Sequence, residues 1–487
     1  MTGFRKPIRI YMFLCLGACC YILFNAFGTN GPTNINEQDD PTIQSPLHLN
    51  YPQPQLQNEL QPPPSLLSTS AVEEGNVMAS PRNKVAYSDE YAGLPPKEIV
   101  RVVEYINEGY IMLNKDKFGG LDVSYTIVVQ VHERVDYLEI LINSLEKVVG
   151  INKTLVIFSH DSHVKSIDNL IYNISFCRVL QIHYPFSLQL FPNIFPGTDV
   201  NDCPAEMTKQ KALKEKCLSV NQSDTYGHFR SKKLSQIKQH WWWKLNYVFG
   251  KIMPKYNLAG QVILIEEDHY VMPDMLHMLD EMNEQRGKLC PDCNIMSLGA
   301  YKVDSKQYVK NINVMTVTPW YSSLHNMGMV VNMNMWHEIS RCSEKFCTFD
   351  DYNWDWTLLF MSKSCMTTPM EVLSALAPRI IHIGDCGVHK HDCHTQKSLD
   401  LASQLVDISK HLLFGKNLSI GKVTKKSPKP PKPNGGWKDV RDHFLCFHNS
   451  VSMPYNKNNS FYGSKYSELN KDPLIFPFMK LKELEQL

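Results

Sequence analysis

The chain has 487 residues, of which 43% are hydrophobic and 20% are charged, so it is long enough for one large globular domain or two ordinary ones. Its 50 basic side chains nearly balance 49 acidic ones, and the formal net charge is +1 at pH 7. This balance excludes functions that depend on the charge of the whole surface, such as general nucleic-acid binding. Any role for charge must therefore be local.

The N-terminus combines basic residues with an uncharged, mostly apolar run. Arg5, Lys6 and Arg9 precede residues 10–28, which are about long enough to cross a bilayer as a helix. The run exceeds the apolar part of a cleaved signal peptide, and no small-residue cleavage site follows it, which favours a retained signal anchor. The basic flank predicts a type II membrane protein with residues 1–9 in the cytoplasm and the rest in the lumen. The short span suits the thinner bilayer of the early secretory pathway or the Golgi better than a plasma membrane, and the expected location is the Golgi membrane.

The next segment, residues 29–95, is rich in Pro, Gln, Asn and Ser and has few periodic apolar positions. This composition cannot form a core, so we expect a disordered lumenal stem. A catalytic domain is expected over 96–450 and a C-terminal tail over 451–487. Residues 97–113 have apolar side chains at helical spacing and predict a first helix that packs on this domain.

Strand and helix patterns then alternate along the chain. Residues 124–131 are typical of a buried strand, 134–149 have helical spacing, and 155–159 are again strand-like. Further buried strands are predicted at 179–184 and 261–265. This order indicates an α/β fold with a mainly parallel, Rossmann-like sheet flanked by helices. Ligands of such sheets bind beyond the carboxyl ends of the strands.

Three acidic residues follow the last of these strands, at the edge where ligands are expected. Glu266, Glu267 and Asp268 offer hard oxygen ligands that suit Mn²⁺ or Mg²⁺ bound to a diphosphate. A bare acidic triplet is more often a solvated turn, but three like charges at this edge repel one another unless a cation compensates. His382 follows another apolar run and could reach the same edge as Asp268.

Carboxylates and aromatic rings alternate over residues 350–356. Rings stack on the apolar faces of sugars and a carboxylate can accept a hydroxyl proton, so this segment could bind a glycan and supply a general base. An aromatic core helix capped by aspartates explains the pattern equally well. The triplet Trp241, Trp242 and Trp243 cannot share one helix face, so at least one ring is expected to face solvent or ligand.

The chain has 14 cysteines, three of them within residues 10–28, and most of the others should form disulfides in an oxidising lumen. Cys290 and Cys293 are interpreted as a tight-loop disulfide, because no second cysteine pair stands at zinc-ribbon spacing. The Lys and Pro residues of 422–433 predict an exposed, solvated loop. Glycosylation sequons support the secretory route and begin at Asn152, Asn173, Asn221, Asn417 and Asn458.

Eight segments form a distinctive set, namely 129–134, 155–161, 240–245, 266–270, 325–328, 350–356, 382–387 and 434–437. As a set they resemble the N-acetylglucosaminyltransferase II family, the α-1,6-mannosyl-glycoprotein 2-β-N-acetylglucosaminyltransferases. The resemblance extends over residues 124–446. It implies a GT-A fold and an inverting, metal-dependent transfer of GlcNAc from UDP-GlcNAc. The acceptor would be the 2-hydroxyl of the α-1,6-linked mannose of an N-glycan whose other arm already carries GlcNAc.

The resemblance also implies roles for single residues. Asp355 would be the general base that removes the mannose hydroxyl proton as the oxygen attacks opposite the leaving UDP. Asp268 and His382 would bind Mn²⁺, which neutralises the diphosphate. More loosely, the acceptor side would be lined by Asn326, Tyr352 and Trp354. The donor site would comprise Gln130, Val131, His132, Glu133, Arg134, Asp161, Gln236, Ile237, Lys238, Gln239 and His240.

The chain departs from the family at Ile237 and Gln239 and in residues 301–308, which affects the donor contacts. The resemblance implies five disulfides and leaves Cys177 free. They are Cys203–Cys217, Cys290–Cys293, Cys342–Cys365, Cys347–Cys446 and Cys386–Cys393.

Other functions are compatible with parts of the sequence. The related transferase for the α-1,3 arm shares fold, donor and metal, although the Trp-rich segments favour the α-1,6 interpretation. A non-catalytic lectin or scaffold would bind glycans through residues 352–356. A glycoside hydrolase would act through two carboxylates, and this function would not explain the metal-suited acidic residues at the end of the strand. The expected partners are UDP-GlcNAc, a glycoprotein N-glycan and the membrane, without nucleic acid, and the chain could form a homodimer.

Overall fold

The computed structural model describes residues 94–451, except for 122, 302, 385–394, 427 and 430. The expected cytoplasmic tail, signal anchor and nearly all of the stem lie outside the described residues, as does the C-terminal tail after residue 451. Within the described part of the chain, no helix has the length and apolarity needed to span a membrane. The proposed domain boundaries remain predictions.

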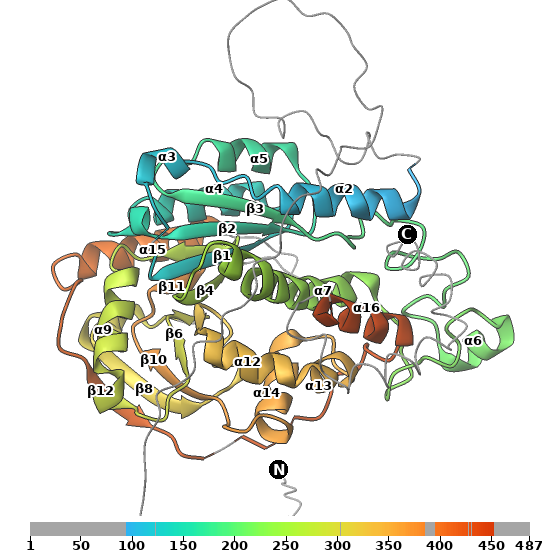
Figure 1. Cartoon of the computed structure of the whole chain (residues 1–487). Coiled ribbons are helices and arrows are strands. Elements are labelled where there is room, and N and C mark those ends of the chain that lie inside the picture. The colour runs from blue at the N-terminus through green and yellow to red at the C-terminus, as the bar shows by residue number, and fades with distance from the viewer. Residues whose placement is uncertain are drawn as a thin grey trace, which may run out of the picture. The chain divides into compact units, whose positions relative to one another are not determined.

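A nine-stranded sheet forms the centre of the described part of the chain (Figure 1), in the order β12-β8-β10-β6-β9-β4-β1-β2-β3. The predicted strands β1 (Tyr125–Val131), β2 (Leu155–His160), β3 (Arg178–His183) and β4 (Gln261–Glu266) pair in parallel. β9 (Met329–Val331) is antiparallel to both of its neighbours. The remaining strands are β6 (Ile295–Ser297), β8 (Val314–Pro319), β10 (Glu371–Ala375) and β12 (Ser419–Val423). The expected α/β fold with a mostly parallel sheet is confirmed.

A second, three-stranded sheet has the order β5-β11-β7. It consists of β5 (His269–Val271), β11 (Ile380–His382) and β7 (Gly299–Ala300). β5 and β11 are antiparallel. Because β5 begins three residues after β4 ends, this small sheet adjoins the acidic strand end of the large one.

Helices cover both faces of the large sheet. Side chains alternate along β1, so Val128 joins the core beneath α7 while Val129 joins the core beneath α4 and α9. The helices are α2 (Pro96–Glu108), α3 (Lys115–Phe118), α4 (Val135–Leu145), α5 (Lys165–Tyr172), α6 (Lys209–Glu215), α7 (Lys232–Tyr247), α8 (Met253–Lys255), α9 (Met275–Leu289), α10 (Ser305–Tyr308), α11 (Ser322–His325), α12 (Met333–Arg341), α13 (Ser343–Thr348), α14 (Trp354–Ser364), α15 (Thr395–Ser409) and α16 (Val440–Val451), with short turns η2 (Ile151–Lys153), η3 (Val248–Ile252) and η4 (Val309–Asn311).

Two predicted segments differ from their observed bounds. The first helix ends at Glu108 rather than 113, because Tyr110 has a positive φ of 43° and Leu113 bonds to Val179 of β3. The Lys- and Pro-rich segment does not begin as a loop. Its first two residues, Lys422 and Val423, belong to the edge strand β12.

The three tryptophans of α7 are all buried, so the expectation that one would face solvent or ligand is wrong. Trp241 stacks on Trp354, with ring centroids 4.4 Å apart. Trp242 donates from Nε1 to the hydroxyl of Ser450 at 2.7 Å. Trp243 is 5% exposed. The reason is that α7 packs between the sheet, α14 and α16, so that each side of the helix is covered here.

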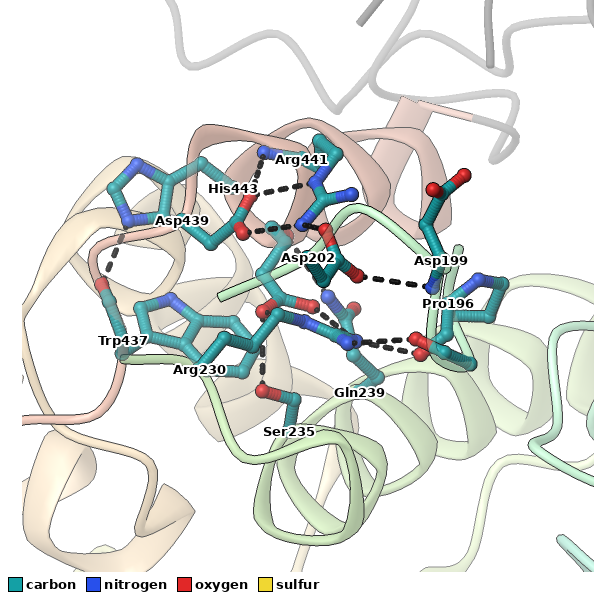
Figure 2. A network of polar contacts seen from close by, with 12 residues as sticks. Pro196, Asp199, Asp202, Arg230, Ser235, Gln239, Trp437, Asp439, Arg441 and His443 are labelled. Carbon is teal, nitrogen blue, oxygen red and sulfur yellow. Dashed lines mark hydrogen bonds and ion pairs between the residues drawn. The ribbon is translucent and has the colours of Figure 1, made fainter. Parts of the chain in front are cut away.

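Polar contacts anchor α16 to α7 and to the loop that precedes it (Figure 2). Arg230 donates to both carboxylate oxygens of Asp442, at 2.6 and 3.1 Å. Gln239 of α7 donates to the backbone carbonyl of Asp442 at 2.8 Å. Arg441 pairs with Asp202 at 2.8 Å. Because most of these side chains are buried, α16 is an integral part of the fold.

Four of the implied disulfides are present among the described residues, and the fifth, Cys386–Cys393, lies outside them. Cys347–Cys446 joins α13 to α16 across 99 positions of sequence. Cys177 is buried and free, as the resemblance implies, and burial raises the pKa of its thiol to about 12. The other bridges are Cys203–Cys217, Cys290–Cys293 and Cys342–Cys365.

Arg379 and Asp274 form an ion pair in which both side chains are 0% exposed, with Nε 2.9 Å from Oδ1. Arg379 also donates to the carbonyls of Ala377 and Ile312, at 2.6 and 2.9 Å. Removing the carboxylate would leave a buried guanidinium charge without compensation. We therefore expect Asp274→Ala to lower the free energy of unfolding by about 3–5 kcal/mol.

This loss of stability can be measured in urea unfolding followed by tryptophan fluorescence, as a lower urea concentration at the midpoint. Lys211→Ala provides the control, because Lys211 pairs with Glu215 at 3.7 Å on the surface and such pairs contribute less than about 1 kcal/mol. Equal shifts for the two variants would contradict the importance of the buried pair.

Candidate active site

The carboxyl ends of β1, β2 and β4 meet at one edge of the sheet, as predicted. Gln130 of β1 is in register with Ser159 on one side and Glu266 on the other. Lys244 of α7 donates from Nζ to the side-chain oxygen of Gln130. Burial lowers the pKa of Lys244 to about 8, although the nearby Glu266 opposes this shift. Lys244 and Glu266 therefore both lie at this edge of the sheet, below the loops that follow the strands.

Arg134 connects two members of the acidic triplet. It donates from Nε to Glu267 at 2.6 Å and from Nη1 to Oδ2 of Asp268 at 2.7 Å. The other oxygen of Glu267 accepts from the backbone N–H of His132 at 2.7 Å. Glu267 is 1% exposed, so it orders the loop between β1 and α4 rather than facing a ligand.

Asp161 follows β2 and contacts histidines from two other segments. Its Oδ1 lies 2.7 Å from Nδ1 of His132, and its Oδ2 lies 3.4 Å from Nδ1 of His240. Burial disfavours ionisation of Asp161, but the two histidines outweigh it and hold its pKa well below the usual range. Burial likewise opposes protonation of His132, and Asp161 nevertheless raises that pKa to about 9. An anionic Asp161 and a cationic His132 therefore face the expected donor site.

Several residues of the expected donor site point into the protein, which corrects their assignment. The side chain of Val131 is 0% exposed in the core. Lys238 donates to the carbonyl of Asp351 at 2.7 Å, and Gln239 bonds to α16 as described above. Gln236 accepts from the loop after β3 at 2.6 Å. These side chains are used for packing because α7 is covered on several sides.

In the same segment, residues 236–240, the side chain of Ile237 is half-buried against the core, whereas that of His240 reaches Asp161. A pocket lies beside Asp161, with Ser162, His183 and Gln189 among its lining residues. Ser162 also donates to the exposed Glu133 at 2.8 Å. This pocket is lined by hydrogen-bonding groups, and its volume of about 10 Å³ has room for one water molecule.

A second cluster can hold a metal ion. Glu266, Asp268 and His269 each offer a ligand atom, and these atoms lie within 4.8 Å of one another. Oδ1 of Asp268 and Nε2 of His269 are buried without a hydrogen-bond partner in the described structure. Burial of an unpaired carboxylate oxygen is costly, so a cation bound to Asp268 fits the site. Nδ1 of His269 accepts from the backbone N–H of Glu266 at 3.1 Å, so Nε2 of the neutral ring carries a proton. The Nε2 of His382 lies 3.2 Å from Oδ2 of Asp268, so a nitrogen donor also lies beside this carboxylate.

The small sheet explains why His382 reaches Asp268. Its register places His382 opposite His269, and the backbone N–H of Ile383 donates to the carbonyl of Asp268 at 2.9 Å. Gly384 follows directly. A Cβ atom at that position would lie 2.2 Å from Oδ2 of Asp268, so only glycine allows this close approach.

Asp355 lies in the first turn of α14, and both carboxylate oxygens accept hydrogen bonds. Oδ1 accepts from the backbone N–H of Trp356 at 2.8 Å, and Oδ2 accepts from Nδ2 of Asn326 at 3.0 Å. Burial raises the pKa of Asp355 to about 6, against the effect of the Trp356 hydrogen bond. A carboxylate that titrates near neutral pH is suited to general-base catalysis.

Asp355 and the metal-suited cluster are connected by side-chain contacts. Nδ2 of Asn326 also donates to the hydroxyl of Tyr301 at 2.7 Å. The Tyr301 ring packs against His382, with centroids 5.5 Å apart, and His382 pairs with Asp268. The structure therefore brings Asp268, His382, Asn326 and Asp355 into one site.

The two aromatic residues expected at the acceptor side behave differently. Trp354 is 7% exposed and stacks in the core, so it does not line the site. Tyr352 is half-buried against the turn at Gly436, which has φ of 77°. Trp356 is the partly exposed aromatic residue next to Asp355, and its Nε1 donates to the carbonyl of Lys432 at 2.9 Å.

Comparison with known proteins assigns the chain. The family model of N-acetylglucosaminyltransferase II (MGAT2) matches residues 100–446, which is more than half of the sequence. The chain belongs to the N-acetylglucosaminyltransferase II family. As a member of this family it is a glycosyltransferase.

Similar proteins from three organisms bear the name alpha-1,6-mannosyl-glycoprotein 2-beta-N-acetylglucosaminyltransferase. The one from Sus scrofa is 40% identical over 347 residues, or 71% of this chain and 78% of that protein. The one from Homo sapiens is 41% identical over 348 residues, with the same shares. The one from Arabidopsis thaliana is 29% identical over 353 residues, or 71% of this chain and 80% of that protein.

Sequence reasoning missed two residues of this family member's site. His269 adjoins Asp268 in sequence, and that adjacency was a usable signal that His269 lies in the same cluster. Nothing in the local sequence of Tyr301 indicates that it links Asn326 to His382. Its position follows from the register of β7 beside β11.

Proposed function

We propose that the chain transfers GlcNAc from UDP-GlcNAc, with inversion, to the 2-hydroxyl of the α-1,6-linked mannose of an N-glycan. The names of the similar proteins support this acceptor. The observation that carries the proposal is the contact path from the metal-suited Asp268, through His382, Tyr301 and Asn326, to Asp355. A transferase needs a leaving-group site and a base in one cleft, and this path joins candidates for both.

Asp355 is proposed as the base. Two hydrogen bonds fix its carboxylate, so its orientation does not depend on the substrate. It would accept the proton of the mannose 2-hydroxyl while that oxygen attacks the anomeric carbon from the face opposite UDP. One displacement inverts the anomeric centre, and no covalent enzyme intermediate is needed.

The donor diphosphate would lie at the acidic strand end. Asp268 and His382, with His269 and Glu266 close by, would hold Mn²⁺ there. When bound, that ion would neutralise the charge of the departing UDP. Arg134 lies against the same carboxylate and can contribute positive charge to the diphosphate. The uracil ring and ribose are proposed to lie beside Asp161 and His132, which pair at 2.7 Å at this edge of the sheet.

We further propose a GT-A arrangement of the catalytic domain and a single-pass type II topology in the Golgi membrane. The parallel strands β1, β2 and β4 with an acidic strand end support the GT-A arrangement. The basic, apolar N-terminus and the lumenal disulfides support the topology.

The acceptor is tested with the purified full chain in detergent and UDP-GlcNAc. Two biantennary-core glycans serve as acceptors, one with GlcNAc already on the α-1,3 arm and one without it. We expect transfer only to the first, with the new GlcNAc β-1,2-linked to the α-1,6 mannose by NMR. Transfer to the second glycan would identify the related transferase of the α-1,3 arm instead. Donor binding without turnover on either would indicate a scaffold.

A further inference from the structure

The segment Lys422–Lys432 carries five lysines, which we call the lysine surface: Lys422, Lys425, Lys426, Lys429 and Lys432. All five are exposed. None of them pairs with a carboxylate of the described residues, unlike Lys211 and Lys251. The segment itself contains no Asp or Glu. Charges that the protein leaves uncompensated are available to a partner.

The backbone of this segment is held in place by aromatic side chains. The carbonyl of Lys426 accepts from the hydroxyl of Tyr321 at 3.3 Å. The carbonyl of Lys432 accepts from Nε1 of Trp356 at 2.9 Å, and that of Pro433 accepts from the hydroxyl of Tyr226 at 2.6 Å. These contacts use main-chain carbonyls of the segment, and the lysine side chains remain exposed to solvent. The lysine surface is therefore positioned by the fold.

One end of the lysine surface lies close to the proposed acceptor side of the site. Trp356 follows Asp355 in α14, so its bond to Lys432 places one end of the segment beside the proposed base. Beyond that end, Asn434 donates to the carboxylate of Asp351 at 2.8 Å, which fixes the turn before α14. A polypeptide whose glycan enters at Asp355 can therefore come within reach of these lysines.

We propose that the lysine surface binds acidic side chains of the polypeptide that carries the acceptor glycan. This inference rests on the proposed function. A core glycan has no charged groups, so the sugar itself cannot use five ammonium groups. Opposite charges increase the rate of encounter and specify the partner more than they add contact energy. The chain would then process glycans on acidic protein segments faster than the same glycans on basic ones.

The test uses the full chain in detergent and a single glycan that carries GlcNAc on the α-1,3 arm. This glycan is offered in three forms: as the free glycan, on an acidic glycopeptide and on a basic glycopeptide. In the native protein we expect kcat/KM at low salt to be roughly tenfold higher for the acidic than for the basic glycopeptide. The difference should fall as salt rises, because the Debye length shrinks to about 8 Å at physiological ionic strength.

The variant reverses three charges as K425E, K426E and K429E. It should reverse the preference between the two glycopeptides and leave transfer to the free glycan unchanged. The matched control, K153E with K209E and K288E, changes the net charge equally at exposed sites in η2, α6 and α9 and should keep the native preference.

An unchanged preference in the K425E/K426E/K429E variant would overturn the proposal. So would an equal loss on all three acceptors, which would indicate damage to the site. Loss of binding to anionic-lipid vesicles, with unchanged glycopeptide rates, would assign the surface to the membrane instead. If the native protein fails to use the free glycan, the proposed function itself is wrong, and the two failures are thus distinguishable.

Discussion

Replacing Asp355 with Asn should reduce kcat by roughly 10³-fold, within the range that a general base contributes. Asn cannot accept the proton of the attacking hydroxyl, yet it keeps the size of the side chain. Its one carbonyl oxygen can still accept from the backbone N–H of Trp356, whereas its amide NH2 would face Nδ2 of Asn326, which now donates to Asp355. The dissociation constant of UDP, measured by calorimetry, should remain unchanged because Asp355 lies on the acceptor side. This combination separates loss of the base from loss of the donor site.

The pH dependence provides a second measurement of the same role. Burial raises the pKa of Asp355 to about 6, and only the ionised form can accept a proton. The value of kcat/KM should therefore be level above this pH and fall about tenfold per unit below it. Glu146→Gln, at an exposed position after α4, should keep the native rate and profile. An Asp355→Asn protein with native activity would exclude this base.

Asp268→Asn should weaken Mn²⁺ binding by at least roughly 100-fold and abolish transfer, because even residues that only support metal ligands contribute up to about that much. The carboxylate lies at the centre of the cluster, with its Oδ1 unpaired and its Oδ2 beside His382. Binding is measured directly from the paramagnetic resonance of free Mn²⁺, which does not depend on activity. EDTA should likewise stop transfer by the native protein.

The control is Asp136→Asn, which removes one exposed carboxylate from α4 and should leave Mn²⁺ affinity unchanged. His382→Gln should weaken binding less than Asp268→Asn, since it removes a single neutral donor. Native Mn²⁺ affinity in the Asp268→Asn protein, or transfer in the presence of EDTA, would show that the metal is not bound at this strand end.

The elements that were predictable from sequence are those with strong local patterns. The strands β1 to β4 are mostly apolar because both faces of the sheet are covered, and such runs are visible without a structure. Once these strands are parallel, the edge that carries Gln130, Asp161 and Asp268 follows from topology. The small sheet was not predictable. Its strands have two or three residues, too few for a periodic signal, and it decides the position of His382.

The side-chain directions within α7 were also beyond local reasoning. A helix packed on one side would expose one of three consecutive tryptophans, and the sequence contains no sign that α16, some 200 positions later, covers the same helix. The segment of Gln236, Lys238 and Gln239 was assigned to the donor through the family resemblance. Lys238 and Gln239 instead donate to the backbone carbonyls of Asp351 and Asp442. Gln236 accepts from the backbone N–H of Leu188.

The disulfide between Cys347 and Cys446 has a consequence for proteolysis. The lysine surface lies between these two cysteines in sequence, and exposed lysines are the preferred target of trypsin-like proteases. A single cut there would divide the polypeptide without releasing α16, because the covalent bridge and the Arg230–Asp442 ion pair retain the C-terminal fragment. A nicked molecule would therefore keep the helix that covers α7 until a reductant opens the bridge.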